Sequence, residues 1–325
     1  MDYKTKIPVY ILSGFLGSGK TTVLLNMLEH CKNNGQQPGI ILNELGQENV
    51  EGHLFEDRKV VELLNGCICC TIQDDLKETM NDLVAEMDNN PLDVLFIEGT
   101  GVANPLEIQE VLLTDPYVEQ FEIMSIITVL DASHFREYQS IFASSSEVRK
   151  LVKEQIISGS LLLLNKTDLI GPAELQKVIR KIRQMGGDES NIIQCQFGQV
   201  AHNILFEKRF QSFMMNPQNT HIVQEHGHHH HSLIQAIKLE DVPPFPMKSY
   251  EKWFKGLPNN VLRAKGYIEI EQTNELVNFQ YASNKVTFTR LPASTPKKSI
   301  IILIGTDLNN EAISEHCKHL LEGIL

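Results

Sequence analysis

The sequence predicts an α/β domain with a mostly parallel sheet over residues 1–215, followed by a smaller α+β domain over residues 233–325. In the first part, continuous apolar runs alternate with amphipathic stretches, as in parallel sheets whose strands are covered on both faces. A glycine-rich stretch directly follows the first apolar run. The alternation weakens from about residue 203, and the polar, histidine-rich residues 216–232 are typical of a linker.

The elements of the first domain follow from short apolar runs for strands and from apolar residues at helical spacing for helices. Strands are expected at 7–13, 38–43, 59–64, 92–98, 123–130, 160–165 and 191–195. Helices are expected at 22–30, 72–88, 105–113, 146–157 and 172–185. Because ligands of such folds bind at the carboxyl ends of the strands, the residues that follow each strand are candidates for a site.

The second domain shows a run of strands with helices near either end, which indicates an α+β sandwich. Strands are expected at 233–239, 261–271, 276–282, 285–290 and 299–305, and helices at 247–256 and 309–323.

The composition excludes several classes of protein. A formal net charge of −12 argues against a nucleic-acid surface, which needs a basic patch. No apolar run approaches the length of a transmembrane helix, and the N-terminal run breaks at Gly14, so neither a membrane span nor a signal peptide is expected. Six cysteines in a chain of this length form no disulfide framework, which indicates a reducing, cytoplasmic location.

The stretch Gly14–Thr21 fits GxxxxGK[ST], the pattern of a phosphate-binding P-loop. It lies between an expected strand and an expected helix, so backbone N–H groups and a helix N-terminus can face an anion. Lys20 is expected to contact the β- and γ-phosphates and to act in catalysis, and the Thr21 hydroxyl is expected to bind Mg²⁺. The phosphate-binding candidates are Gly14, Gly17, Ser18, Gly19, Lys20 and Thr21. The alternative is an accidental glycine-rich turn, which the flanking elements argue against, so the sequence predicts a nucleoside triphosphate site.

The segment Asn165-Lys166-Thr167-Asp168 directly follows an expected strand and is similar to the guanine-specificity motif of GTPases. A carboxylate such as that of Asp168 can accept hydrogen bonds from N1 and the exocyclic amine of guanine, a donor pair that adenine lacks. Asn and Asp also suit ordinary turns, which is the alternative interpretation. Together with the P-loop, the segment predicts GTP rather than ATP.

Glu98 ends another expected strand and precedes Gly99-Thr100-Gly101. P-loop enzymes keep a carboxylate at this place to hold Mg²⁺ or its water, so Glu98 is a candidate for metal binding and catalysis. The two glycines would let the following loop move when the γ-phosphate leaves. The alternative is an acidic strand cap that faces solvent.

Three thiols lie within four residues at Cys67, Cys69 and Cys70. Thiolates that converge on one ion favour Zn²⁺, Cu(I) and similar metals. The segment Asn43-Glu44-Leu45-Gly46 follows the second strand, so Glu44 could complete this metal site or contact Mg²⁺. Buried cysteines that act as hydrophobes, or a redox pair, are the alternatives.

A histidine-rich run lies in the expected linker. Imidazoles bind Zn²⁺, Ni²⁺, Co²⁺ and Cu²⁺, so the run fits loose metal capture, and a functionally idle linker is the alternative. Its metal-ligating candidates are His226, His228, His229, His230 and His231.

These motifs together resemble the CobW family of P-loop GTPases, within the group that contains nickel-insertion and urease-maturation GTPases. The resemblance covers nearly the whole chain. It extends the P-loop to Thr22, assigns Asn43–Gly46 to the first switch, and matches Gly66–Cys70 to a CxCC motif. Glu98–Gly101 matches an ExxG segment, although Gly99-Thr100 stands where relatives more often have a Ser or Thr followed by Ser.

The resemblance implies a cytosolic GTPase that uses Mg²⁺, binds a transition metal at the CxCC site and delivers it to a client metalloprotein. Zinc is the expected metal, with cobalt or nickel as alternatives. A GTP-regulated metal sensor or storage protein with negligible turnover is the alternative function. No nucleic-acid or membrane partner is expected, and homo-oligomerisation stays open.

Overall fold

The computed structural model describes residues 6–42, 60–62, 72–87, 89–186, 191–220, 234–282, 285–290 and 298–324. The chain divides into two compact units, Met1–Arg209 and Phe210–Leu325. The boundary therefore precedes the one expected after residue 215, because Phe210–Met215 forms a strand that pairs with a strand of the second unit. Of the expected linker, residues 216–220 are described, and Asn216 and Asn219 close a tight turn through reciprocal backbone hydrogen bonds.

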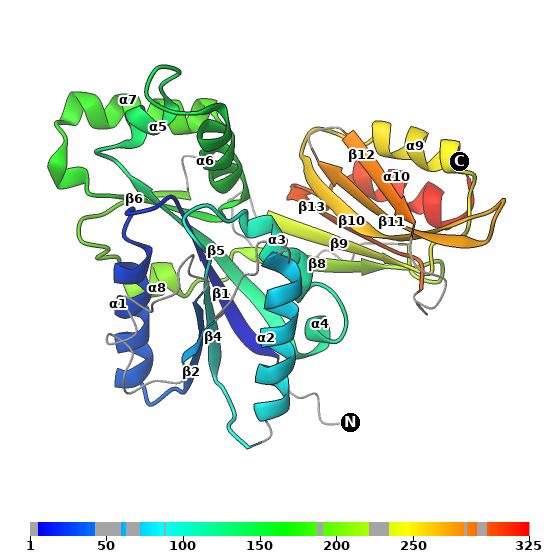
Figure 1. The fold of residues 1–325 in the computed structure, drawn as a ribbon, viewed down its shortest axis with the longest axis horizontal. Helices are drawn as coiled ribbons and strands as arrows, with labels where there is room; N and C mark the ends of the chain where they lie inside the picture. Colours follow the sequence, from blue (N-terminus) through cyan, green and yellow to red (C-terminus); the bar gives the residue numbers. More distant parts are fainter. Residues whose placement is uncertain are drawn as a thin grey trace. The chain divides into compact units, whose positions relative to one another are not determined.

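The first unit is built on a seven-stranded sheet of order β3-β2-β4-β1-β5-β6-β7, in which every pairing is parallel (Figure 1). Its strands are β1 (Ile7–Ser13), β2 (Pro38–Leu42), β3 (Val60–Glu62), β4 (Val94–Glu98), β5 (Phe121–Asp131), β6 (Leu161–Asn165) and β7 (Ile192–Gln194). The predicted parallel sheet is confirmed. Each expected strand is present, with ends that differ by at most two residues from the prediction.

Helices cover both faces of this sheet, with α1 and α8 on one side of the strands and α2 and α3 on the other (Figure 1). The helical segments are α1 (Lys20–Asn33), α2 (Ile72–Glu86), α3 (Pro105–Leu112), α4 (Tyr117–Gln120), α5 (Phe135–Gln139), α6 (Ser146–Ser158), the 3₁₀ turn η2 (Thr167–Leu169), α7 (Pro172–Gln184) and α8 (His202–Leu205). The leucines of β6 show why the run is apolar throughout. Leu161 and Leu163 pack in one cluster with α1, whereas Leu162 and Leu164 pack in another with α6 and α7.

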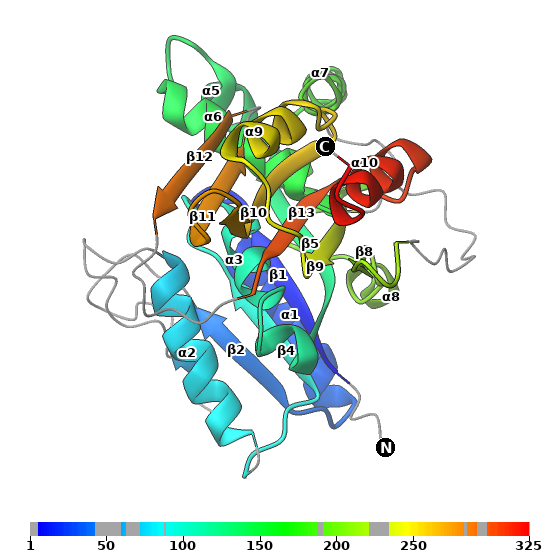
Figure 2. The ribbon, with the colours of Figure 1, turned by 90° about the vertical axis from the view of Figure 1, so that its right-hand side faces the viewer.

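The second unit contains a six-stranded sheet of order β12-β11-β10-β13-β9-β8, antiparallel except for the parallel pair β8–β9. Its elements are β8 (Phe210–Met215), β9 (Ile234–Glu240), α9 (Met247–Lys255), β10 (Val261–Ile270), β11 (Glu275–Ala282), β12 (Lys285–Arg290), β13 (Ile300–Thr306) and α10 (Glu311–Leu321). Both helices lie on the same face of the sheet, where Tyr250 and Phe254 of α9 and Cys317 and Leu320 of α10 join one apolar cluster (Figure 2). The expected α+β domain is confirmed.

The first unit positions polar residues along one edge of its sheet. β1 lies between β4 and β5, and the registers pair Leu12 with Glu98 and Asp131 with Asn165. The carboxyl ends of four neighbouring strands therefore meet around the P-loop, which is where an open α/β sheet binds ligands. None of the helices in the described ranges combines the length and apolar character needed to cross a membrane.

Candidate functional site

The loop between β1 and α1 passes close to two neighbouring strands. Gly14 and Gly19 have positive φ values of 132° and 103°. A Cβ at Gly14 would lie 2.1 Å from the carbonyl oxygen of Val129, and one at Gly19 would lie 2.5 Å from Asn165 Nδ2. Side chains at these two positions would collide with the ends of β5 and β6, so the close approach requires glycine.

The surroundings of this loop fit an anion. α1 begins at Lys20, has no acidic residue in its first turn, and is capped by no side chain of the described residues. The Ser18 hydroxyl is buried and hydrogen-bonds to no residue in the described part of the chain. Lys20 is buried as well, whereas Thr22 is exposed. Phosphate oxygens would satisfy the hydroxyl and the N–H groups at the helix N-terminus, whose first turn contains no acidic residue.

Two oxygen ligands suited to a hard cation lie beside this loop. The Thr21 hydroxyl donates a hydrogen bond to Glu98 Oε1 at 3.2 Å. Glu98 is the last residue of β4 and only 9% exposed, so it is not the solvent-facing strand cap of the alternative interpretation. A hydroxyl and a carboxylate at this separation are the ligand types that Mg²⁺ prefers, and the structure brings together the two residues that the sequence proposed for it.

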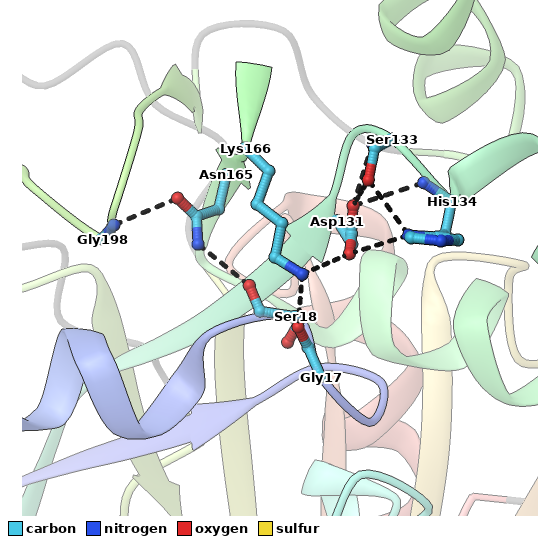
Figure 3. A network of polar contacts seen from close by, with 8 residues as sticks. All are labelled: Gly17, Ser18, Asp131, Ser133, His134, Asn165, Lys166 and Gly198. Atoms are coloured by element: carbon cyan, nitrogen blue, oxygen red, sulfur yellow. Dashed lines mark hydrogen bonds and ion pairs between the residues drawn. The ribbon is translucent and has the colours of Figure 1, made fainter. Parts of the chain in front are cut away.

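The Asn165–Asp168 segment is tied to the P-loop (Figure 3). Asn165 Nδ2 donates to the carbonyl oxygen of Ser18 at 3.0 Å. Lys166 Nζ donates to the carbonyl oxygen of Gly17 at 2.8 Å, and Lys166 itself has a left-handed backbone with φ of 60°. Asp168 follows in η2 with its side chain exposed. The segment is therefore held against the phosphate-binding loop, with the carboxylate of Asp168 accessible to a ligand.

Asp131, the last residue of β5, is not among the site residues predicted from the sequence. Its carboxylate is buried and accepts a hydrogen bond from Lys166 Nζ at 2.7 Å and from the Ser133 hydroxyl at 2.6 Å (Figure 3). Burial raises the pKa of Asp131, but the hydrogen bonds from Lys166 and Ser133 outweigh it, so the pKa lies below its usual value. Asp131 follows a continuous apolar run as Glu98 does, and that signal could have identified it.

A second missed segment is the loop Cys195–Gly198, which follows β7. The backbone N–H of Gly198 donates to Asn165 Oδ1 at 3.0 Å, and Asn26 Nδ2 of α1 donates to the carbonyl oxygen of Gly198 at 2.9 Å. Thr167 Oγ1 donates to the carbonyl oxygen of Cys195 at 3.1 Å. This loop therefore borders the Asn165–Asp168 segment. Nothing in its composition separated it from an ordinary turn.

The loop after Glu98 is held by α6. Gln155 is fully buried, and its Nε2 donates to the carbonyl oxygens of Gly101 and Ala103, both at 3.3 Å. Asn104 Nδ2, at the end of the same loop, donates to Glu154 Oε2 at 3.2 Å. Gln155 was not predicted from the sequence either, because a glutamine in an amphipathic helix is usually at the surface.

The proposed transition-metal ligands Glu44, Cys67, Cys69, Cys70, His226 and His228–His231 lie outside the described residues. The other three cysteines, Cys31, Cys195 and Cys317, are free and buried. Burial raises the pKa of these thiols to about 11, 11 and 12, respectively, so they are protonated and poor metal ligands near neutral pH. Within the described ranges, no three histidine, cysteine, aspartate or glutamate residues form a group that could hold a metal ion.

Comparison with known proteins finds two family matches. Residues 8–194 match the family described as CobW/HypB/UreG, nucleotide-binding domain, and residues 234–321 match the cobalamin synthesis protein cobW C-terminal domain.

Individual proteins of known name are also similar to this chain. A Sinorhizobium protein named zinc chaperone CobW is 27% identical over 294 residues, which cover 82% of each chain. The zinc chaperone YjiA of Escherichia coli is 34% identical over 173 residues, which cover 52% of each chain. The crystal structure of Zn(II)-bound YjiA GTPase from E. coli aligns with 97% of this chain and 99% of its own, at 23% identity and a TM-score of 0.46.

Proposed function

Because the chain belongs to the CobW/HypB/UreG family of nucleotide-binding proteins, we propose that it is a GTPase that binds zinc and delivers it to a client metalloprotein. Two hydrogen bonds support the assignment of a GTP site. Asn165 donates to the carbonyl oxygen of Ser18, and Lys166 donates to that of Gly17. They join a segment that can recognise a base to a loop that can bind phosphates.

The reaction is transfer of the γ-phosphoryl group of GTP to water, which yields GDP and phosphate. Lys20 and the P-loop amides bind the phosphates and neutralise the charge that develops on them in the transition state. Thr21 and Glu98 would hold Mg²⁺, which when bound offsets charge on the β- and γ-phosphate oxygens. Asp168 accepts hydrogen bonds from guanine and so selects GTP over ATP.

Zinc is the metal proposed for Cys67, Cys69 and Cys70, with Glu44 as a further ligand. Thiolates suit this ion, and the two curated relatives described above are named zinc chaperones. The histidines at 226 and 228–231 would supply weaker sites, because imidazoles without a preformed geometry bind several divalent ions loosely. GTP would order the two switch segments around Glu44 and Glu98, and hydrolysis would release these segments and change the geometry of the cysteine site, which lies between them in sequence.

Base selection tests the nucleotide assignment. Asp168→Asn replaces an acceptor with a donor, so the variant should lose affinity for GTP and prefer xanthosine triphosphate, whose 2-oxo group accepts a hydrogen bond. Asp241→Asn, at an exposed aspartate of the second unit, is the matched control and should bind like the wild type. Calorimetry with GTP, ATP and xanthosine triphosphate measures the preference, and equal affinity of the wild type for ATP and GTP would contradict the proposal.

A further inference from the structure

Phe197, in the loop after β7, combines two unfavourable features. Its backbone is left-handed, with φ of 53°, a conformation that is rare for bulky side chains. The residue is 69% exposed, although burial of an aromatic side chain is favourable. An exposed aromatic residue in a strained conformation persists only where the surrounding structure holds it, and such positions concentrate at ligand sites.

Contacts on both sides of Phe197 hold it in place. On one side, Thr167 donates to the carbonyl oxygen of Cys195. On the other, Gly198 is fixed through its N–H to Asn165 and through its carbonyl oxygen to Asn26. The backbone of the loop is therefore set by the Asn165–Asp168 segment and by α1, and the ring is left for solvent or a ligand.

The residues bonded to this loop indicate which kind of ligand could cover the ring of Phe197. Thr167, which is bonded to the loop, directly precedes the exposed Asp168. Asn165, which is also bonded to the loop, contacts the P-loop carbonyl of Ser18. A planar ring on a rigid loop beside a carboxylate that can recognise a base has the shape and chemistry to contact the flat face of a purine.

We infer that Phe197 stacks on the guanine base that Asp168 recognises, so that the two residues together set nucleotide affinity. The inference rests on the proposed GTP function and adds a specificity residue to it. Binding of the base would cover apolar surface of Phe197 that is exposed in this structure.

The test measures the affinity of the full chain for GTP, GDP and inorganic tripolyphosphate. Phe197→Ala should weaken GTP and GDP binding by about 5- to 150-fold, the range that corresponds to the loss of one base–aromatic stack. Binding of tripolyphosphate, which has no base, should stay unchanged. In steady-state assays, KM for GTP should rise while kcat at saturation stays within about twofold, because the ring does not touch the γ-phosphate.

Two further substitutions of Phe197 separate the effect of the ring from that of the backbone, and a substitution of Phe142 is the control. Glycine accepts a left-handed conformation without strain, so Phe197→Gly should bind GTP as weakly as Phe197→Ala if the ring is what matters. Phe197→Tyr keeps the aromatic face and should bind GTP nearly as well as the wild type. Phe142→Ala removes a 95% exposed ring from the loop between α5 and α6 and should have no effect on binding.

Wild-type affinity of Phe197→Gly for GTP would overturn the inference, as would an equal loss of GTP and tripolyphosphate binding in Phe197→Ala. The Asp168→Asn variant keeps the two proposals distinct. If its base preference changes as expected but Phe197→Ala binds GTP normally, only the stacking inference fails. If its base preference does not change, the guanine site itself is misassigned.

Discussion

Asp131→Asn should both destabilise the first unit and weaken GTP binding. In the wild type, Asp131 Oδ2 lies 2.7 Å from Lys166 Nζ, and the two side chains are 2% and 32% exposed. The substitution keeps the acceptor Oδ1 for Ser133, but it can place an NH₂ group against the lysine ammonium. Two donors then face each other where a charge-assisted hydrogen bond existed.

The size of the effect follows from the exposure of the two partners. Breaking a fully buried ion pair costs about 3–5 kcal/mol, and losing a hydrogen bond to a charged group costs about 1.5–3 kcal/mol. Because Lys166 is one-third exposed and can turn to water, the lower range applies, and the free energy of unfolding should fall by about 1.5–3 kcal/mol. Lys166 also contacts Gly17 of the P-loop, so GTP affinity should fall by about tenfold, equivalent to about 1.4 kcal/mol.

The effect should depend on pH in one direction. The pKa of Asp131 in the folded protein lies below the ordinary aspartate value of 3.8, so its stabilising contribution is complete above that pH. The contribution is lost as the pH falls from 3.8 through the lower folded-state pKa. The difference between wild type and Asp131→Asn should therefore be full at neutral pH and shrink only in that acidic range.

Urea denaturation followed by circular dichroism measures the stability, and calorimetry measures GTP affinity. Asp74→Asn is the matched control, because Asp74 forms an exposed pair with Lys77 at 3.8 Å, and such pairs contribute little. Wild-type stability and GTP affinity in Asp131→Asn at neutral pH would refute the role assigned to the pair.

Two other predictions concern catalysis. Lys20→Ala should lower GTP turnover by at least about 100-fold, the cost of losing a positive group that stabilises transition-state charge. It should leave zinc binding of the nucleotide-free protein intact, as a zinc titration would measure, and loss of zinc binding would contradict separate sites. Gln155→Leu removes both hydrogen bonds to the loop after Glu98 and should lower kcat by about tenfold with little change in KM. Gln176→Leu, at an exposed glutamine of α7, is the control, and a Gln155→Leu enzyme with normal kcat would exclude a positioning role.

The sequence predicted the sheet of the first unit because its strands are covered on both faces and read as continuous apolar runs. β6 illustrates this, since all four of its leucines are buried. β8 was not predicted, because only its first and last residues, Phe210 and Met215, are buried, and the segment becomes a strand through its pairing with β9. That pairing is a long-range contact that no local pattern contains.

Some residues of the candidate site could likewise be predicted from the sequence, whereas others could not. Lys20, Thr21 and Glu98 belong to motifs whose residue spacing predicts phosphate and Mg²⁺ binding. The structure brings all three to one edge of the sheet. Asp131 and Gln155 act through partners 35 and 54 positions away, so their contacts follow only from the folded chain. The strain at Phe197 is a backbone property, and the sequence does not display it.

In the proposed function, GTP binding and zinc binding are coupled through the cysteine segment. If GTP changes zinc affinity, linkage requires zinc to change GTP affinity by the same factor, and a coupling of about 1–3 kcal/mol corresponds to roughly 5- to 150-fold. Competition with a chromophoric zinc chelator, in the apo, GTP-analogue and GDP states, measures that factor directly. We expect different zinc affinities in the three states, and a Cys69→Ser, Cys70→Ser variant that still binds GTP but shows no coupling. Equal zinc affinities of the wild type in all three states would contradict nucleotide-controlled delivery of the metal.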